Sequence, residues 1–176
     1  MMAQSFVVST GYTYAFEGYL YTPAAEKLEG SAYGVLIVEY YQDGALISSA
    51  ESDHFTSSSP SNEWVRFSVS HRAPWAGNTV TCRVLCAIMG SSGGYDGAVY
   101  FDGLSVTGSY VGATNVQAGS VWNPGFEYTE PGTVLEGVDS WTALGDAGVI
   151  SDDYSRSGDN SLRIYGPETL ISQDWE

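Results

Sequence analysis

The sequence predicts an all-β protein, and three observations support this fold class. The 176-residue chain is rich in glycine and tyrosine, with 21 and 13 residues, and has a single lysine, Lys27. No apolar stripe of helical period runs for more than about 12 residues. Residues 99–106 instead alternate apolar with small or polar side chains at period two, as a half-buried strand does. We therefore expect strands joined by glycine-rich turns around one core, which suits the length of the chain.

The first part of the chain holds seven expected strands. They are separated by glycine-, proline- or serine-rich segments, and Gln42-Asp43-Gly44 supplies a tight hairpin turn. Residues 23–30 are expected to form a loop or a single helical turn, and residues 52–62 a polar loop. The expected strands are 5–8, 11–21, 33–41, 45–49, 63–70, 79–89 and 99–106.

The second of these strands has two different faces. Tyr14 and Phe16 share one face, whereas Glu17, Tyr19 and Tyr21 share the other, because successive side chains of a strand alternate. The second face combines aromatic rings with a carboxylate. Such a polar-aromatic lining is typical of a binding cleft.

The later part of the chain begins with a linker. Residues 107–120 are rich in Gly, Ser, Ala and Thr, a composition typical of flexible connections. Five further strands are expected, at 121–128, 140–143, 148–150, 161–165 and 170–175.

Short motifs in both parts resemble one family. Asn123-Pro124-Gly125-Phe126-Glu127, Trp141-Thr142, residues 157–164 (SGDNSLRI) and residues 171–173 (ISQ) resemble the first half of a carbohydrate-binding module of the family 4/9 type. Upstream, residues 12–16 (YTYAF), 64–67 (WVRF), Ala73-Pro74 and 99–106 (VYFDGLSV) resemble its second half. The resemblance implies a jelly-roll β-sandwich of two antiparallel sheets, of the galactose-binding-like group, with its two halves in reversed order.

The reversed order divides the chain into a C-terminal-type half at 1–108, a linker at 109–120 and an N-terminal-type half at 121–176, together one domain. Residues 112–176 followed by 1–108 would make one circularly permuted sandwich, since the two ends of a domain often lie close together. Alternatively, each half completes its counterpart in a neighbouring copy by strand exchange. A third explanation is an excerpt from a tandem array, cut out of phase with its repeats.

The resemblance also implies a structural calcium ion. Carried over by position, its ligands are the Asp102 and Glu127 carboxylates and oxygen atoms of the Gly158 and Asn160 region. Hard oxygen donors from three segments suit Ca²⁺, which takes 6–8 oxygen ligands. The competing explanation is that Asp102 and Glu127 cap turns.

Saccharide binding would depend on aromatic side chains, because a pyranose presents an apolar C–H face that stacks on Trp or Tyr. The resemblance places Trp64 and Trp141 in the core. Trp75 follows Pro74 in a loop where the family tends to have a small residue, which makes it a candidate for an exposed contact. The candidate ligand-binding residues are Glu17, Tyr19, Tyr21, Trp75 and Trp175, and packing within the protein is the competing explanation for each.

Charge excludes two classes of partner. The chain carries 21 acidic and 6 basic residues, for a net charge of −15. It lacks the Lys and Arg clusters that neutralise nucleic-acid phosphates or anionic membrane surfaces. No stretch is apolar for long enough to span a membrane. The N-terminal residues lack a signal-peptide pattern, and the resemblance implies an extracellular or cell-surface protein in a mature or excised form.

Two further patterns argue against catalysis and metal–thiolate chemistry. Neither His54 nor His71 belongs to a recognisable catalytic or zinc-binding motif. Cys82 and Cys86 lie four residues apart on one expected strand, about 13 Å at roughly 3.3 Å per residue, which is too far for a disulfide. The sequence therefore favours a non-catalytic carbohydrate-binding module with a structural calcium. The alternative is an extracellular structural subunit that self-assembles by strand donation between chains.

Overall fold

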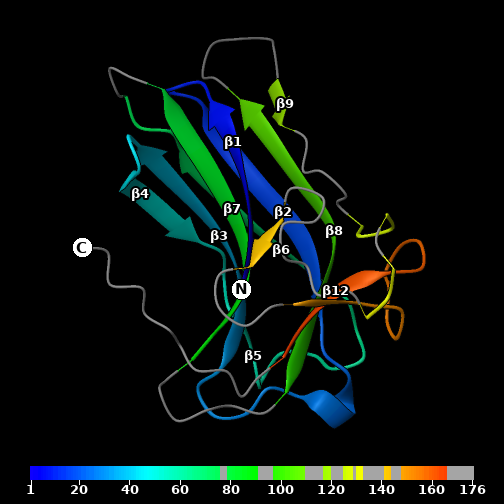
Figure 1. The fold of residues 1–176 in the computed structure, drawn as a ribbon. Coiled ribbons are helices and arrows are strands. Elements are labelled where there is room, and N and C mark those ends of the chain that lie inside the picture. The colour runs from blue at the N-terminus through cyan, green and yellow to red at the C-terminus, as the bar shows by residue number, and fades with distance from the viewer. Residues whose placement is uncertain are drawn as a thin grey trace.

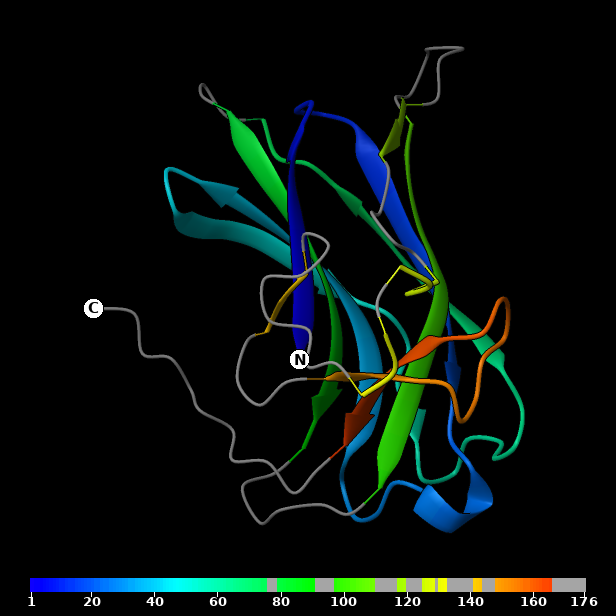
Figure 2. The same ribbon diagram turned by 45° about the vertical axis from the view of Figure 1, so that its right-hand side comes forward.

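The protein is a sandwich of two antiparallel sheets that pack face to face (Figures 1 and 2). The all-β fold class predicted from the sequence is confirmed. The computed structural model describes residues 1–75, 79–90, 97–109, 117–119, 125–128, 130–132, 141–143 and 148–165.

Sheet A has the strand order β10-β1-β7-β3-β4, and the short β5 also pairs with β3. All neighbours are antiparallel. Its strands are β1 (Met2–Val8), β3 (Tyr33–Gln42), β4 (Ala45–Glu51), β5 (Phe55–Thr56), β7 (Val80–Met89) and β10 (Thr142–Ala143).

Sheet B has the order β11-β12-β8-β2-β6, and the short β9 also pairs with β8. Its strands are β2 (Thr13–Tyr21), β6 (Val65–Arg72), β8 (Ala98–Ser109), β9 (Gln117–Gly119), β11 (Val149–Ser151) and β12 (Ser161–Tyr165). One turn of 3₁₀ helix, η1 (Ala24–Glu26), follows β2. Within the described residues, no helix has the length and apolar character to cross a membrane.

Strands from the two ends of the sequence share both sheets. Strand β12 pairs with β8, with Leu162 opposite Phe101, and β10 pairs with β1. Figure 2 shows the orange-red β12 lying beside the long green β8. Residues from the later part of the chain therefore complete sheets that are built mainly from the first part.

The observed elements differ from the expected ones at three places. Residues 125–128 form a turn rather than a strand, because Phe126 has a left-handed φ of 61° that extended backbone does not permit. Part of the expected linker, Gln117–Gly119, is strand β9. Strand β5 lies within the expected polar loop, where Phe55 is fully buried. Residues 121–124 and the expected strand 170–175 lie outside the described residues.

The core lies between the sheets and is formed by alternating side chains of their strands. Its members from both parts of the chain include Phe16, Leu20, Leu36, Val38, Val99, Phe101, Phe126, Trp141, Leu162 and Ile164. Cys82 and Cys86 are buried and free, as the sequence predicts. Burial raises the pKa of the Cys82 thiol to about 12, so it behaves as a neutral core side chain.

A bulge in β8 changes which side chains face the core. Phe101 faces the core before the bulge and Leu104 faces it afterwards, so one extra residue lies between them. Gly103 occupies this position with a φ of 60°, a conformation that glycine adopts without strain. Asp102 directly follows Phe101 on the strand, so by ordinary alternation its side chain faces away from the core.

Candidate functional site

The outer face of sheet B carries an aromatic cluster, which we define as Tyr21, Trp64, Tyr100 and Tyr154. The Tyr21 ring lies 5.1 Å from that of Trp64 and 4.9 Å from that of Tyr154, measured between centroids. The Tyr100 ring meets the Tyr154 ring edge-on at 5.2 Å. Strands β2 and β8 supply Tyr21 and Tyr100, and the other two rings come from segments next to strands. Such tilted and edge-on pairs are favourable aromatic arrangements.

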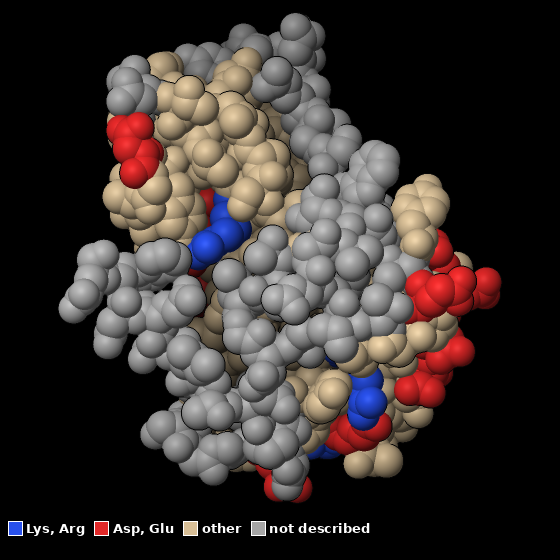
Figure 3. All heavy atoms as spheres, in the orientation of Figure 1, with Lys and Arg blue, Asp and Glu red and all other residues tan. Residues whose placement is uncertain are grey.

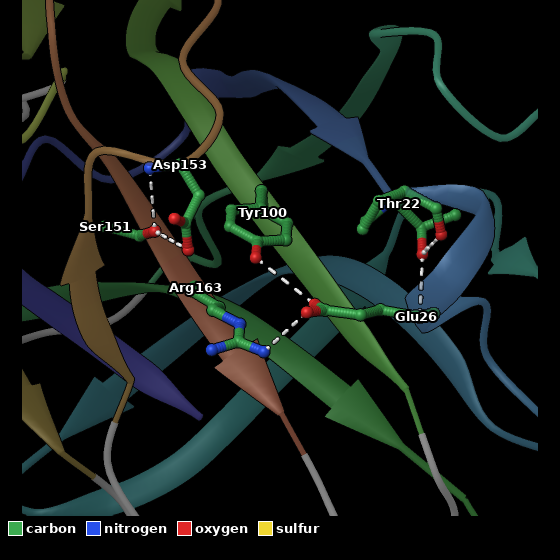
Figure 4. A network of polar contacts seen from close by, with 7 residues as sticks. Thr22, Glu26, Tyr100, Ser151, Asp153 and Arg163 are labelled. Carbon is green, nitrogen blue, oxygen red and sulfur yellow. Dashed lines mark hydrogen bonds and ion pairs between the residues drawn. The ribbon is translucent and has the colours of Figure 1, made fainter.

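A charged pair adjoins the aromatic cluster. Arg163 of β12 donates to Glu26 of η1 at 2.9 Å, and the Tyr100 hydroxyl donates to the same carboxylate at 3.2 Å. Figure 4 shows Arg163 and Tyr100 pointing toward Glu26 from neighbouring strands. The Arg163 guanidinium also lies 5.0 Å from the centroid of Tyr165. Burial raises the pKa of Tyr100, so its hydroxyl remains a proton donor at neutral pH.

Two rings of this region are open to solvent. Tyr154 is 38% exposed and Tyr165 is 40% exposed, whereas Tyr21 and Tyr100 are buried. The charged pair is partly accessible as well, because the side chains of Arg163 and Glu26 are about one third exposed. The outer face of sheet B thus offers two ring surfaces next to hydrogen-bonding groups.

The predicted residues Glu17, Tyr19 and Tyr21 do lie together on this outer face, but other side chains already contact them. Glu17 accepts a hydrogen bond from Arg66 at 2.7 Å. The Arg156 guanidinium lies 3.5 Å from the centre of the Tyr19 ring. Tyr21 stacks within the aromatic cluster. Tyr21 is therefore part of the buried floor of this face, whereas Glu17 and Tyr19 are partly exposed but engaged by Arg66 and Arg156.

Trp75 lies at the other end of the sandwich. Its ring is 69% exposed and packs on Gly11, where a Cβ atom would approach the ring to 2.6 Å. Gly11 precedes β2, whereas Tyr21 ends it, and about 9 residues of strand at roughly 3.3 Å each separate the two positions. Trp75 is thus exposed, as the sequence predicts, but remote from Tyr19 and Tyr21. Trp175 lies outside the described residues.

The predicted calcium ligands converge near the aromatic cluster, on the loop that connects β11 and β12. Asp102 is fully buried, and its Oδ2 atom accepts backbone N–H groups of Arg156 and Ser157, both at 2.8 Å. Its Oδ1 atom accepts the N–H of Gly103. Burial raises the pKa of Asp102, and these N–H donors oppose that increase.

Glu127 also binds the loop between β11 and β12, at residues that follow those bound by Asp102. Its two carboxylate oxygens accept the N–H groups of Asp159 and Asn160 at 2.9 and 3.2 Å. A Cβ at Gly158 would lie only 2.3 Å from Glu127 Oε1, so the carboxylate rests directly on a glycine with a φ of 67°. The Asn160 side chain donates to the carbonyl of Phe126 at 3.4 Å.

The Asp102 and Glu127 carboxylates approach each other across Gly125. A Cβ at Gly125 would lie 3.5 Å from Asp102 Oδ1 and 3.6 Å from Glu127 Oε1. Among the described residues, no group of three or more His, Cys, Asp or Glu side chains could hold a metal ion. Two carboxylates and neighbouring backbone oxygens are thus the donors that this part of the chain offers to a cation.

Sequence reasoning missed several residues of the face. Tyr100 carried a usable signal, because it lies two residues before Asp102 on β8, and side chains two residues apart on a strand point to the same face. Glu26 and Tyr154 lie outside strands and carried no such signal. Trp64 was expected in the core but is half-buried in the aromatic cluster, because it precedes β6 beside the outward-facing Tyr21. Trp141 is fully buried, as expected.

Comparisons with known proteins give no assignment for this site, so its function is inferred from its own chemistry. No protein-family model, curated protein or solved structure matches the chain. Figure 3 shows acidic residues gathered on the side of the molecule where β12 lies. The arginines of this region are held by internal contacts, Arg163 by Glu26 and Arg156 by the Tyr19 ring.

Proposed function

We propose that the protein is a non-catalytic carbohydrate-binding β-sandwich that acts outside the cell or at its surface, with its ligand on the outer face of sheet B. The observation that carries this proposal is the pair of exposed rings, Tyr154 and Tyr165, beside the partly exposed Arg163 and Glu26. A sugar presents an apolar C–H face and a set of hydroxyl groups. The exposed rings suit the C–H face, and the fixed polar groups beside them suit the hydroxyl groups.

The chemistry of each group fits a pyranose. A tyrosine ring accommodates the apolar C–H face of the sugar with little loss of conformational entropy, because its side chain is already packed. The Arg163–Glu26 pair supplies donors and acceptors at fixed positions for hydroxyl groups. Because Tyr100 and Arg163 hold Glu26 from two directions, the carboxylate is oriented before a ligand arrives.

Charge favours an uncharged glycan. The net charge of −15 and the acidic residues near β12 repel uronate and sulfate groups. An uncharged polysaccharide does not meet this repulsion. We therefore expect neutral polysaccharides to bind in preference to acidic ones.

We also propose a structural calcium ion between Asp102 and Glu127. The approach of both carboxylates to Gly125 supports it, because a cation there would offset the cost of burying the Asp102 carboxylate. The loop that this ion would stabilise carries Tyr154. Calcium would therefore act on saccharide binding indirectly, through the position of that ring.

Affinity electrophoresis and calorimetry on a panel of neutral and acidic polysaccharides test the ligand proposal. Tyr154→Ala and Tyr165→Ala should each weaken binding about tenfold or more, since each removes a stacking surface of about 1.4 kcal/mol. Trp75→Ala is the matched control, because it removes a larger exposed ring at the other end of the sandwich. Loss of binding in the Trp75 variant alone would place the ligand elsewhere and overturn the assignment of this face.

Thermal unfolding with calcium and with EDTA tests the metal proposal. Calcium should raise the melting temperature of the wild-type protein, and EDTA should reverse the increase. Replacement of both Asp102 and Glu127 by Ala should lower the melting temperature and remove the response. A wild-type protein that does not respond to EDTA would show that backbone N–H groups alone hold the two carboxylates.

A further inference from the structure

The charges at the candidate site on the outer face of sheet B are not balanced. The Glu26 carboxylate forms an ion pair with Arg163 at 2.9 Å. Asp153, in the loop between β11 and β12, supplies a second carboxylate, and its residue is exposed. Within the described part of the chain, no basic side chain forms an ion pair with Asp153. One of the two carboxylates therefore lacks a countercharge from the protein.

The Asp153 carboxylate has a fixed position beside the aromatic cluster. It accepts a hydrogen bond from the Ser151 hydroxyl at 3.1 Å, and the Asp153 N–H donates to that hydroxyl at 3.2 Å. Figure 4 shows the carboxyl groups of Asp153 and Glu26 on either side of the Tyr100 hydroxyl. Burial is the main cause of the raised pKa of Tyr100, and the charges of Glu26 and Asp153 raise it further. The uncompensated charge thus lies within the site, next in sequence to the exposed Tyr154.

The rings of this face already hold cations that belong to the protein. The Arg163 guanidinium lies 5.0 Å from the centre of the Tyr165 ring and 5.7 Å from that of Tyr100. The Arg156 guanidinium lies 3.5 Å from the centre of the Tyr19 ring. An aromatic ring attracts a cation through the negative charge of its face. The accessible surfaces of Tyr154 and Tyr165 can therefore attract a cation of a ligand as well.

A sugar unit with a protonated amine suits this combination of groups. Its apolar C–H face can stack on a ring, and its ammonium group can donate to a carboxylate in a charge-assisted hydrogen bond. A sugar with hydroxyl groups alone would leave the negative charge of Asp153 uncompensated. The net charge of −15 also raises the local concentration of a cationic ligand near the protein.

We propose that the outer face of sheet B binds polysaccharides of amino sugar units, with their protonated amines at Asp153 and their C–H faces on Tyr154 and Tyr165. The inference rests on the saccharide-binding function proposed above and narrows its ligand class. Glu26 keeps its ion pair with Arg163 and remains available to hydroxyl groups. Because Asp153 is exposed, solvent weakens its attraction for the amine, so the preference over a neutral sugar is about fivefold rather than several orders of magnitude.

Calorimetry with three oligosaccharides of equal length tests the proposal. Oligomers of chitosan, chitin and cellulose share one backbone and differ in one substituent of each ring, which is an ammonium, an acetamide or a hydroxyl group. At slightly acidic pH, where glucosamine is protonated and ordinary carboxyl groups are still ionised, the chitosan oligomer should bind about fivefold more tightly than the other two. Added salt should reduce this preference, because the Debye length is only about 8 Å at physiological ionic strength.

Asp153→Asn and Asp53→Asn form a matched pair of variants. Both remove one negative charge from an exposed residue, but Asp53 lies between β4 and β5 of the other sheet. The amide at position 153 can still accept the Ser151 hydroxyl, so the loop keeps this hydrogen bond. Asp153→Asn should remove most of the preference for chitosan, whereas Asp53→Asn should retain it. Equal effects of the two variants would overturn the assignment to Asp153.

Two further outcomes would overturn the amino sugar as ligand. Equal affinity of the wild type for the chitosan and cellulose oligomers would refute the role of the amine and would still support saccharide binding. Spermidine, a polyamine without a sugar ring, should compete only weakly, because it offers no C–H face to the rings. Competition as strong as that of chitosan would show that charge alone is recognised. If none of the three oligosaccharides binds, the proposed function of the face fails together with this inference.

Discussion

Two carboxylates, one on the outer face of each sheet, are stabilised by different kinds of hydrogen-bond donor. Glu39 of sheet A accepts hydrogen bonds from Arg83 of the neighbouring strand β7 at 2.7 Å and from the hydroxyl of Tyr41, on its own strand β3, at 2.9 Å. Asp102 of sheet B has no basic side chain among its hydrogen-bond donors and instead accepts backbone N–H groups from residues 54 and 55 positions later.

The difference shows how one type of side chain can stabilise either a sheet or a loop. The Glu39–Arg83 pair joins β3 and β7, which many backbone hydrogen bonds already join. Burial and Glu39 raise the pKa of Tyr41 to about 12, so this network stays in one protonation state at neutral pH. Asp102, in contrast, fixes a loop that carries part of the candidate site. The loss of Asp102 should therefore have the wider consequence.

The largest effect is expected for Asp102→Ala. It removes the acceptor of several backbone N–H groups, and each donor left unpaired costs about 1–3 kcal/mol. We expect a loss of about 3 kcal/mol or more in the free energy of unfolding, measured by urea denaturation. Asp102→Asn keeps one acceptor oxygen and should lose less. A larger loss for Asn than for Ala would contradict this explanation.

Gly158→Ala should cause the second-largest loss in the free energy of unfolding. Both Gly158 and Gly132 have a positive φ, which costs an alanine roughly 1 kcal/mol. At Gly158 the new Cβ would also collide with the Glu127 carboxylate, whereas at Gly132 nothing lies within 4 Å. Gly158→Ala should thus destabilise by about 2 kcal/mol more than Gly132→Ala in the same assay. Equal effects would show that the loop and Glu127 separate without cost.

A double-mutant cycle on Glu39 and Arg83 addresses the other carboxylate. The two side chains are 16% and 19% exposed, so their interaction is stronger than that of a surface pair. We expect a coupling energy of about 1–2 kcal/mol from Glu39→Ala, Arg83→Ala and the double variant. Saccharide binding should not change, because this pair lies on the outer face of sheet A. A coupling near zero would show that backbone pairing alone holds the two strands.

The smallest effect concerns pH. Burial lowers the pKa of His71 from 6.5, and its Nε2 atom lies 2.6 Å from Ser48 Oγ. As pH falls below 6.5, the unfolded chain binds a proton before the folded chain does, so His71 reduces stability until its folded pKa is reached. Burial raises the pKa of Asp102, so on acidification the folded state binds a proton before the unfolded state does. The contribution of Asp102 to stability therefore increases as pH falls, opposite to that of His71.

Melting temperatures of the wild type and His71→Gln between pH 7.5 and pH 5.5 should reveal the histidine contribution. The wild type should lose more stability than the variant over this range, which lies above the ordinary carboxyl pKa values. Parallel pH profiles would show that His71 has the same pKa in the folded and unfolded states.

The sequence predicted the all-β fold and most strands because alternation is a local signal. It placed Phe16 inside and Tyr19 outside correctly, since both lie on the regular part of β2. It did not predict that Gly103 interrupts the alternation of β8, because a bulge depends on the register with the neighbouring strand. The turn at Phe126 was likewise missed, because its left-handed φ is unusual for an aromatic residue.

The candidate site was predicted in part. The four proposed calcium ligands do lie at one loop, although the metal itself stays a prediction. The rings of Tyr19 and Tyr21 do share one face of β2, as the alternation predicted, but their contacts with Arg156 and Tyr154 could not be foreseen. Those partners lie more than a hundred residues further along the chain, and no local pattern encodes such a distance.

The pairing of β8 with β12 has a consequence for biosynthesis. Strand β8 ends at Ser109 and its partner begins at Ser161, so a ribosome working at about 5–20 residues per second needs several seconds to supply it. During that interval the nascent chain exposes one edge of β8 and lacks the side chains of Leu162 and Ile164. Chains released before β12 is made should aggregate or bind chaperones, so this later strand decides whether the earlier strands remain soluble.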